Sequence, residues 1–376
     1  MITMVIFVLA IAAASGIFTG LLTQFKQQSK IAETNIEGVV GIEILRQDID
    51  HAGYGLPWNG LIAYSEASSA PASNFNDSTT TSPPRAVISD NNVTFFGGGN
   101  AIFNGTDYLV IKSTNVGIND TSSKWTTLQA APFTPLYDPV TGYNPRVWDI
   151  AAERFVGGDN VIVLTMGATS TTERRLVVDG VNFSTTYANI ITAPWPPTDN
   201  TEKRTVYGVD PDTPLRMPFN RADYYILKFD ADGTDIVPTR CAPDTGVLRK
   251  AVVNQGAGTF AGGTLPLLDC VADLQVVFRL DTDNNGTIDN TTDVIAGLSA
   301  QQIREQVREV RVYVLAHEGQ REPNYAYPNA TIQIPAPPDP AAGLGRTFDF
   351  AASGITNWQN YRWKVYTLVV RPNNLR

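Results

Sequence analysis

Histidine and cysteine are scarce in this chain of 376 residues. The two histidines are His51 and His317, and the two cysteines are Cys241 and Cys270. A multi-histidine metal centre is therefore excluded, because His51 falls in a predicted helix and His317 at the end of a predicted strand. The sequence also lacks a Gly-x-Ser-x-Gly motif, a Walker loop and a Cys-x-x-Cys-His motif. These absences predict that the chain is not an enzyme.

Charge is also low. Only 17% of the residues are charged, and the formal net charge is −9 at pH 7. An acidic chain lacks the basic surface that nucleic acids attract, so no nucleic-acid partner is expected. Asparagine, threonine, serine, glycine and proline are abundant instead, which is typical of a secreted, surface-exposed protein.

The N-terminal segment, residues 1–25, is almost entirely apolar. No charged residue precedes Lys26. The polar side chains before Gln24 are those of Thr3, Ser15, Thr19 and Thr23. An apolar segment of roughly 20 residues can span a bilayer.

Three other roles compete with a stalk that packs into an assembly: a cleavable signal peptide, a simple membrane anchor and a buried core helix. The start Met-Ile-Thr-Met lacks the basic region of a signal peptide, although Ala10–Ala14 resembles a cleavage site.

Residues 26–53 continue this segment as an amphipathic helix. The stretch from Gln24 to His51 contains no proline, and Gly38 and Gly41 are its weak helix formers. Its apolar stripe consists of Ile31, Ile36, Val39, Val40, Leu45 and Ile49. The run Ala52-Gly53-Tyr54-Gly55-Leu56-Pro57 is a stop signal. One continuous helix of this length would measure on the order of 80 Å at about 1.5 Å per residue.

Gly16, Thr19 and Gly20 make the middle of the apolar segment its weakest part, because glycine costs about 1 kcal/mol against alanine in a helix interior. Two interpretations stay open. The segment either loses helical hydrogen bonds when it packs in an assembly, or its glycines merely permit close helix packing.

The rest of the chain predicts an α+β protein in which the long N-terminal helix is followed by a large, mainly antiparallel β domain. We divide it into a β-rich region at 54–238, with a Ser/Thr/Pro-rich loop at 65–84, and a C-terminal β region at 239–376. The expected strands are Asn92–Phe96, Tyr108–Lys112, Asn160–Thr165, Arg175–Val178, Asp223–Phe229, Val271–Leu280, Val307–Leu315 and Tyr361–Val370. A short helix is expected at Gln301–Gln306. Alternation in Val307–Leu315 predicts a half-buried strand.

One loop carries the spacing of a calcium site. Oxygen-bearing side chains occupy positions one, three, five and nine. Gly286 supplies the sharp turn at six, and a backbone carbonyl is available at seven. The candidate ligands are Asp281, Asp283, Asn285, Thr287, Asp289 and Asp293. The usual glutamate at position twelve is replaced by Thr292, with Asp293 one step later, so the expected Ca²⁺ affinity is modest. The alternative is an Asn-Gly turn between two strands.

Cys241 and Cys270 flank a glycine-rich stretch and could close one disulfide outside the cytoplasm. The alternative is two buried free thiols.

Two parts of the chain resemble a known family. An apolar helix that continues into FKQQSKIAETNIEGVVGIEILRQDIDHAGYG is similar to type IV pilins, and in particular to the PilW-like minor pilin branch. The segments LPLLDCVADLQVVFRLDTDNNGTID, VREVRVYVLAHEG and YRWKVYTLVVRPNNLR resemble the last strands of that branch, in the same order. The resemblance covers about Met1–Tyr54 and Thr239–Arg376.

The resemblance implies a structural subunit of an extracellular filament at the cell surface. Such a subunit waits in the inner membrane and then packs through its apolar helix with other pilin subunits, here as a homopolymer. The β domain would form the outer surface for adhesion or contact. The alternatives are a minor or tip pilin that primes assembly, and a monomeric membrane-anchored adhesin.

Three features depart from the family pattern. Asp50 stands where a basic residue is usual. No short basic leader precedes Met1, so the resemblance makes Met1 the mature, methylated N-terminus. Val5 replaces the glutamate that neutralises a neighbouring terminal amine, and a buried ammonium without a partner is costly. Val5 therefore favours a tip position.

Overall fold

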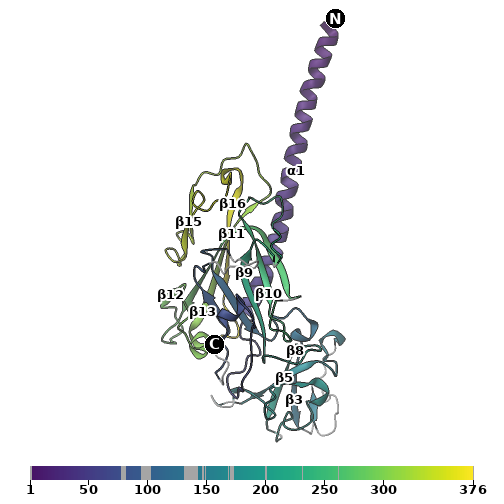
Figure 1. Cartoon of the computed structure of the whole chain (residues 1–376), viewed down its shortest axis with the longest axis vertical. Coiled ribbons are helices and arrows are strands. Elements are labelled where there is room, and N and C mark those ends of the chain that lie inside the picture. Colours follow the sequence, from purple (N-terminus) through teal and green to yellow (C-terminus); the bar gives the residue numbers. More distant parts are fainter. Residues whose placement is uncertain are drawn as a thin grey trace.

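A long N-terminal helix and antiparallel sheets make up the computed structural model (Figure 1). The structure describes residues 2–77, 82–94, 103–130, 143–145, 148, 150–167, 169, 173–199, 201–230, 232–260 and 262–375. The architecture is α+β, as the sequence predicts: an apolar N-terminal helix followed by a mostly antiparallel β domain.

Helix α1 (Ile2–Asp50) is continuous and projects far beyond the β domain, with the N-terminus at its free end (Figure 1). It ends at the predicted stop signal because Gly53 and Gly55 both adopt positive φ angles, which residues with a Cβ rarely adopt. The N–H of Gly53 then donates to the carbonyl of Lys112, so that the chain turns directly into the β domain.

The larger sheet has eight described strands in the order β1-β2-β9-β10-β11-β13-β16, with β12 pairing to β11. Its strands are β1 (Val87–Asp90), β2 (Tyr108–Ser113), β9 (Asn220–Leu227), β10 (Gly246–Val252), β11 (Thr264–Leu280), β12 (Asn290–Thr292), β13 (Val307–Glu318) and β16 (Arg362–Val370). Because β9 pairs with β10, the regions that the sequence divides at residue 238 share this sheet.

A six-stranded sheet in the order β4-β3-β8-β5-β6, with β7 pairing to β5, lies at the end of the molecule opposite the free end of α1 (Figure 1). Its strands are β3 (Trp125–Ala130), β4 (Tyr143–Pro145), β5 (Asn160–Met166), β6 (Glu173–Leu176), β7 (Thr185–Thr186) and β8 (Lys203–Asp210). A separate ribbon pairs β14 (Thr331–Ile334) with β15 (Arg346–Asp349).

The short helices lie between strands. Helix α2 (Ala300–Gln306) matches its predicted position and begins with a capping box between Ser299 and Gln302. The 3₁₀ helices are η1 (Ala72–Phe75), η2 (Asp120–Ser123), η3 (Ala151–Glu153), η4 (Tyr187–Asn189) and η5 (Trp358–Asn360).

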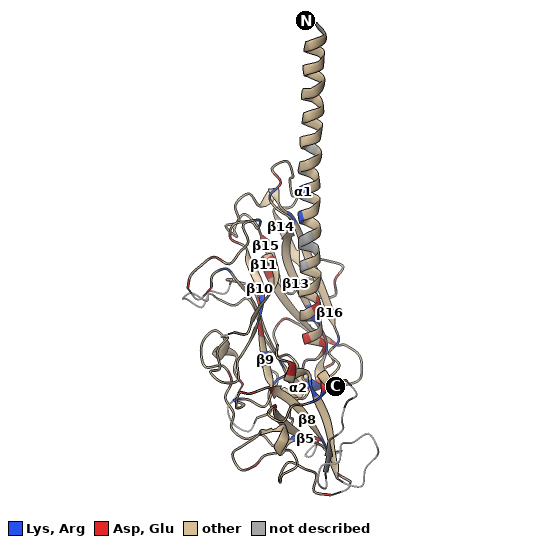
Figure 2. Cartoon of the chain, turned by 90° about the vertical axis from the view of Figure 1, so that its right-hand side faces the viewer, with Lys and Arg blue, Asp and Glu red and all other residues tan. Residues whose placement is uncertain are grey.

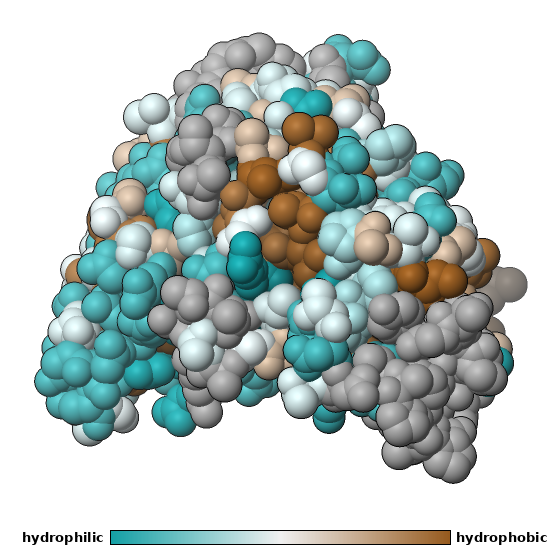
Figure 3. Space-filling model, turned by 90° about the horizontal axis from the view of Figure 1, so that it is seen from below, coloured by the Kyte–Doolittle hydropathy of each residue, from teal (hydrophilic) through white to brown (hydrophobic). Residues whose placement is uncertain are grey.

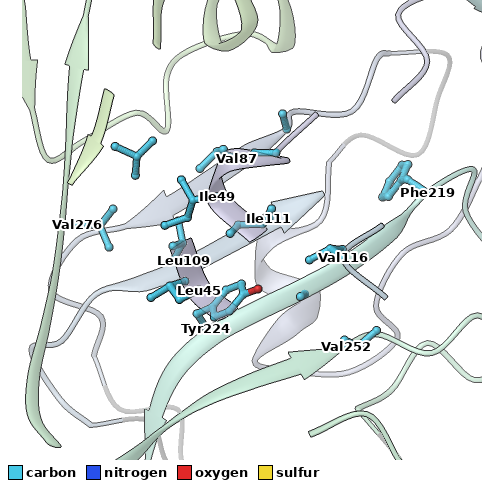
Figure 4. Packing of buried hydrophobic residues seen from close by; sticks show 14 of the residues in the cluster. Leu45, Ile49, Val87, Leu109, Ile111, Val116, Phe219, Tyr224, Val252 and Val276 are labelled. Atoms are coloured by element: carbon cyan, nitrogen blue, oxygen red, sulfur yellow. The ribbon is translucent and has the colours of Figure 1, made fainter. Parts of the chain in front are cut away.

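The main hydrophobic core lies between the end of α1 and the larger sheet. Leu45 and Ile49 of α1 point toward Val87, Leu109 and Val276 (Figure 4). The predicted apolar stripe is correct at this end of the helix, and Ile31 is half-buried beside Gly319, but the residues of the stripe between them are exposed. Further toward the N-terminus, the side chains of Ile36, Val39 and Val40 are 68%, 64% and 57% exposed, because α1 turns a different face to the sheet.

Two strand predictions need correction. Val307–Leu315 lies in β13 but is not half-buried, because the opposite face of this strand is also covered. Tyr313 and Leu315 pack on that face with Ile334 and Phe348 of the β14–β15 ribbon. The second correction concerns Asn92–Phe96. Residues 92–94 form a loop in which Asn92 has a φ of 52°, a left-handed conformation that no strand uses, and residues 95 and 96 lie outside the described part.

The other predicted strands overlap observed ones. Tyr108–Lys112, Asn160–Thr165, Asp223–Phe229, Val271–Leu280 and Tyr361–Val370 fall largely within β2, β5, β9, β11 and β16, and Arg175–Val178 overlaps the second half of β6. The predicted loop at 65–84 contains η1 and no strand among its described residues.

Candidate functional site: the stalk helix and an acidic loop

The first part of α1 is an exposed apolar rod, here called the stalk (Thr3–Ala32). It is long and apolar enough to cross a membrane, and none of its most apolar window is buried. Met4, Phe7 and Phe25 are 77%, 70% and 70% exposed. Charged residues along α1 begin only with Lys26, close to the β domain (Figure 2). A surface of this kind is stable in a bilayer or against other apolar chains, but not in water.

The middle of the stalk is helical without a break. Thr19 Oγ1 donates to the carbonyl oxygens of Ser15 and Gly16, both at 3.0 Å, as threonine commonly does in apolar helices. A Cβ on Gly16 would meet no other atom within 4 Å. Gly16 therefore leaves room for a close neighbour.

The second part of α1 is docked on β11 at a position that only glycine fits. A Cβ on Gly41 would lie 1.7 Å from the carbonyl oxygen of Leu267, and one on Gly38 would lie 3.0 Å from a methyl carbon of Leu268. Helix backbone and strand backbone are therefore in direct contact. The two glycines that weaken the helix locally are the residues that allow it to dock.

Asp48 is a polar anchor within this apolar contact. Its Oδ2 accepts hydrogen bonds from Tyr224 Oη at 2.5 Å and from Lys250 Nζ at 2.7 Å. Burial raises the pKa of Asp48, while Lys250 opposes that shift. Two residues later, both carboxylate oxygens of Asp50 accept from Asn373 Nδ2 at 2.9 Å. The acidic residue at position 50 thus ties the helix end to the C-terminal segment.

The acidic loop brings three of the predicted calcium ligands together. Asp281, Asp283 and Asp289 each offer a carboxylate oxygen, and these oxygens lie within 4.8 Å of one another. Backbone N–H groups shape the loop: Asn285 N donates to Asp281 Oδ1 and Gly286 N to Asp281 Oδ2, both at 3.0 Å. Such a group of carboxylates suits a hard cation such as Ca²⁺.

The other predicted ligands lie differently. The backbone N of Thr287 donates to Asn285 Oδ1 at 2.8 Å, so that the Asn285 side chain is engaged within the loop. Asp293 is not part of the group of three carboxylates, and its Oδ2 accepts from Asn91 Nδ2 at 2.9 Å.

Arg308 is a member of this site that the loop spacing did not indicate. Its Nε and Nη2 donate to Asp281 Oδ2 at 3.0 and 2.9 Å. Burial raises the pKa of Asp281, but the hydrogen bonds from Arg308, Gly286 and Asn285 outweigh it and hold the pKa below the usual range. The guanidinium also offsets part of the negative charge that would attract a cation. Three carboxylates with one arginine fit a weak Ca²⁺ site.

The predicted disulfide is present: Cys241 and Cys270 are bonded, with their Cα atoms 4.9 Å apart. His317 lies beside the bond and is buried. Its Nε2 accepts a hydrogen bond from the backbone N of Ala242 at 2.8 Å, which requires the neutral imidazole. Burial lowers the pKa of His317 to about 3.

The end of the molecule opposite the stalk carries an apolar patch. Seen from that end, the molecule shows an apolar patch surrounded by mostly hydrophilic residues (Figure 3). A groove of about 1000 Å³ also lies on the smaller sheet, with Met166, Val178 and Pro194 among its apolar lining residues and Lys203 among its charged ones.

No protein-family model, curated protein or solved structure gives a significant match to this chain.

Proposed function

We propose that this chain is a structural subunit of a type IV pilus-like extracellular filament. One observation carries the proposal: a continuous 49-residue helix whose apolar outer part is exposed and whose inner part is fixed to a β domain. The same residues 1–54 carry the resemblance to type IV pilins.

The free energy gained by burying the apolar side chains of the stalk supports a role in assembly. Burying one large apolar side chain contributes about 1.5–3 kcal/mol. The large side chains that the stalk exposes are Met4, Val5, Ile6, Phe7, Val8, Leu9, Ile11, Ile17, Phe18, Leu21, Leu22 and Phe25. Their exposure would cost far more than the roughly 5–15 kcal/mol by which a domain is stable. The stalk therefore needs a membrane before assembly and the stalks of other subunits after it.

The β domain would then face outward. The Cys241–Cys270 disulfide suits an oxidising location beyond the inner membrane. The apolar patch at the far end of the domain lies at the greatest distance from the membrane and is a surface for adhesion or contact (Figure 3).

The same geometry serves two related roles. A minor or tip pilin uses the same stalk, and Val5 supports that position because a tip subunit need not neutralise a neighbour's amine. A monomeric adhesin would keep its stalk in the inner membrane permanently.

The test places a charge in the stalk. Ala12→Asp and Ile17→Asp should each abolish filaments, because a carboxylate inside an apolar helix bundle is not tolerated. The β domain should still fold and keep its disulfide. Val181 is the matched control, since it is an apolar residue of the β domain that is 85% exposed. Val181→Asp should leave filaments intact.

Electron microscopy of sheared cell-surface filaments is the measurement, together with mass spectrometry of the N-terminal peptide. Normal filaments from either stalk variant would contradict the proposal. A wild-type protein found only as monomers in the inner membrane would support the anchored adhesin.

A further inference from the structure

Beneath the segment from Glu66 to Asp77, the larger sheet buries two cations side by side. Lys112 of β2 and Arg221 of β9 are cross-strand neighbours, and both side chains are 0% exposed. Glu66 Oε2 and Asp223 Oδ1 accept from Arg221 at 2.9 and 2.7 Å. We call Glu66, Asp77, Lys112, Arg221 and Asp223 the buried ion network. Buried charges require such partners, because removal from water costs several kcal/mol for each ion.

An amine and a carboxylate are in direct contact within this network. Lys112 Nζ lies 2.6 Å from Asp77 Oδ2 and 2.8 Å from Glu66 Oε1. The side chains of Asp77 and Glu66 are 7% and 1% exposed. The ring of Phe219 lies 5.4 Å from Nζ, and Arg85 Nε donates to Asp77 Oδ1 at 2.6 Å. The pair is therefore closed off from bulk water, with a second carboxylate on the amine and a guanidinium on the free carboxyl oxygen.

We propose that Lys112 and Asp77 form an intramolecular amide bond between Nζ and Cγ in the mature protein. Two groups held in one geometry react as if they were present at very high concentration, with effective molarities that reach about 10⁵–10⁸ M in well-oriented cases. Burial also keeps away the water that would hydrolyse the product.

The surrounding residues supply each step. The Lys112 ammonium passes one proton to Asp77 Oδ2, which frees the lone pair of Nζ and converts the carboxylate into a neutral, electrophilic carboxyl group. Nζ attacks Cγ of Asp77, and negative charge develops on Oδ1, where Arg85 Nε already donates. The Cγ–Oδ2 bond then breaks. Glu66 takes a second proton from Nζ and delivers it to Oδ2, which leaves as water with both protons. One ammonium and one carboxylate become one amide and one water, without an oxidant or a further reactant.

After the amide bond has formed, the remaining charges of the buried ion network still have partners. The reaction removes one cation and one anion together, and Arg221 remains paired with Glu66 and Asp223. Arg85 keeps its acceptor because Oδ1 becomes the amide oxygen. The fully buried ammonium is replaced by a neutral group, which lowers the desolvation cost of the network.

The test is the intact mass of the full-length protein after reduction of the disulfide, with peptide mapping to fix the N-terminal residue. We expect a mass lower than that of the amino-acid sequence by one water molecule. Trypsin should not cleave after Lys112, and the digest should contain one branched peptide that joins Lys112 to Asp77. A wild-type protein of full mass, with these residues in separate linear peptides, would overturn the proposal whether or not the protein forms filaments.

Variants locate the bond. Lys112→Arg and Asp77→Ala should each restore the full mass, and Glu66→Gln, which has no base, should slow or prevent the loss of water. Lys250→Arg is the matched control, because Lys250 Nζ also contacts a carboxylate, Asp48 Oδ2 at 2.7 Å, but touches no second one among the described residues. It should keep the mass deficit. A deficit that persists in Lys112→Arg would place the dehydration elsewhere and refute the assignment.

Discussion

The contact between Gly41 and the carbonyl oxygen of Leu267 makes the docking of α1 sensitive to a single methyl group. In Gly41→Ala, the new Cβ would lie 1.7 Å from that oxygen, whereas ordinary contact begins at 3.4 Å. Leu267 belongs to β11, which pairs with β10 at the neighbouring residues Pro266 and Leu268, so we expect the helix to move rather than the strand. A shift of that size would stretch the 2.5 and 2.7 Å hydrogen bonds from Tyr224 and Lys250 to Asp48.

The magnitude follows from three contributions. Overpacking costs about 1–3 kcal/mol. Weakening the hydrogen bonds to a charged group costs about 1.5–3 kcal/mol. Alanine gains about 1 kcal/mol over glycine in a helix interior. The free energy of unfolding in Gly41→Ala should therefore fall by about 1.5–5 kcal/mol.

The assay is denaturant unfolding of the full chain in detergent micelles, followed by tryptophan fluorescence. Gly16→Ala is the matched control, because a Cβ there meets nothing within 4 Å. It should leave the midpoint of the β domain unchanged. Equal midpoints for Gly41→Ala and the wild type would refute the close backbone contact.

Three further predictions concern the β domain. Chelation of Ca²⁺ should lower the melting temperature, and Asp283→Ala should remove that sensitivity, because an ion that binds only the folded state stabilises it. A melting temperature that changes with neither chelator nor added calcium would mean that the loop is only a turn between strands. Replacing both Cys241 and Cys270 with serine should lower stability by about 3–4 kcal/mol, given a separation of 29 residues, as measured by denaturant midpoint; an unchanged midpoint would contradict it. The pKa of His317 is 6.5 in the unfolded chain and about 3 in the folded protein. Between these pH values the unfolded state binds more protons, so the free energy of unfolding should decrease as the pH falls from 6.5 toward 3. The free energy of unfolding should change by at most about 1.4 kcal/mol per pH unit. In His317→Gln, it should depend less on pH over this range. Parallel stability–pH profiles of the variant and the wild type would contradict this role of His317.

Sequence reasoning worked where local signals agree with packing. Gly53 and Gly55 end the helix because the chain needs positive φ angles at these residues. Val271–Leu280 and Tyr361–Val370 are long β-branched and aromatic runs, which favour strands wherever they pack.

It failed where distant parts of the chain decide the environment. Tyr313 and Arg311 looked like the water-facing side of a strand, but Asp339 lies above them and accepts hydrogen bonds from both. Nothing near residue 313 in the sequence could reveal that cover. For the same reason the loop spacing could not indicate Arg308, which reaches Asp281 from β13.

The docking face of α1 was found only in part, for a different reason. Hydrophobic periodicity correctly indicates Leu45 and Ile49. The rest of this face is built from Gly38, Gly41 and the carboxylate of Asp48, while apolar Val39 and Val40 remain exposed. The helix therefore carries two independent surfaces. One fixes the β domain through backbone contact and a buried anchor, and the other continues the apolar surface of the stalk toward the domain. Changes to the first should alter unfolding and spare membrane insertion, whereas changes to the second should alter assembly and spare the fold. The proposed filament subunit would need this separation, because its helix would leave a membrane and enter a polymer without disturbing the domain that it carries.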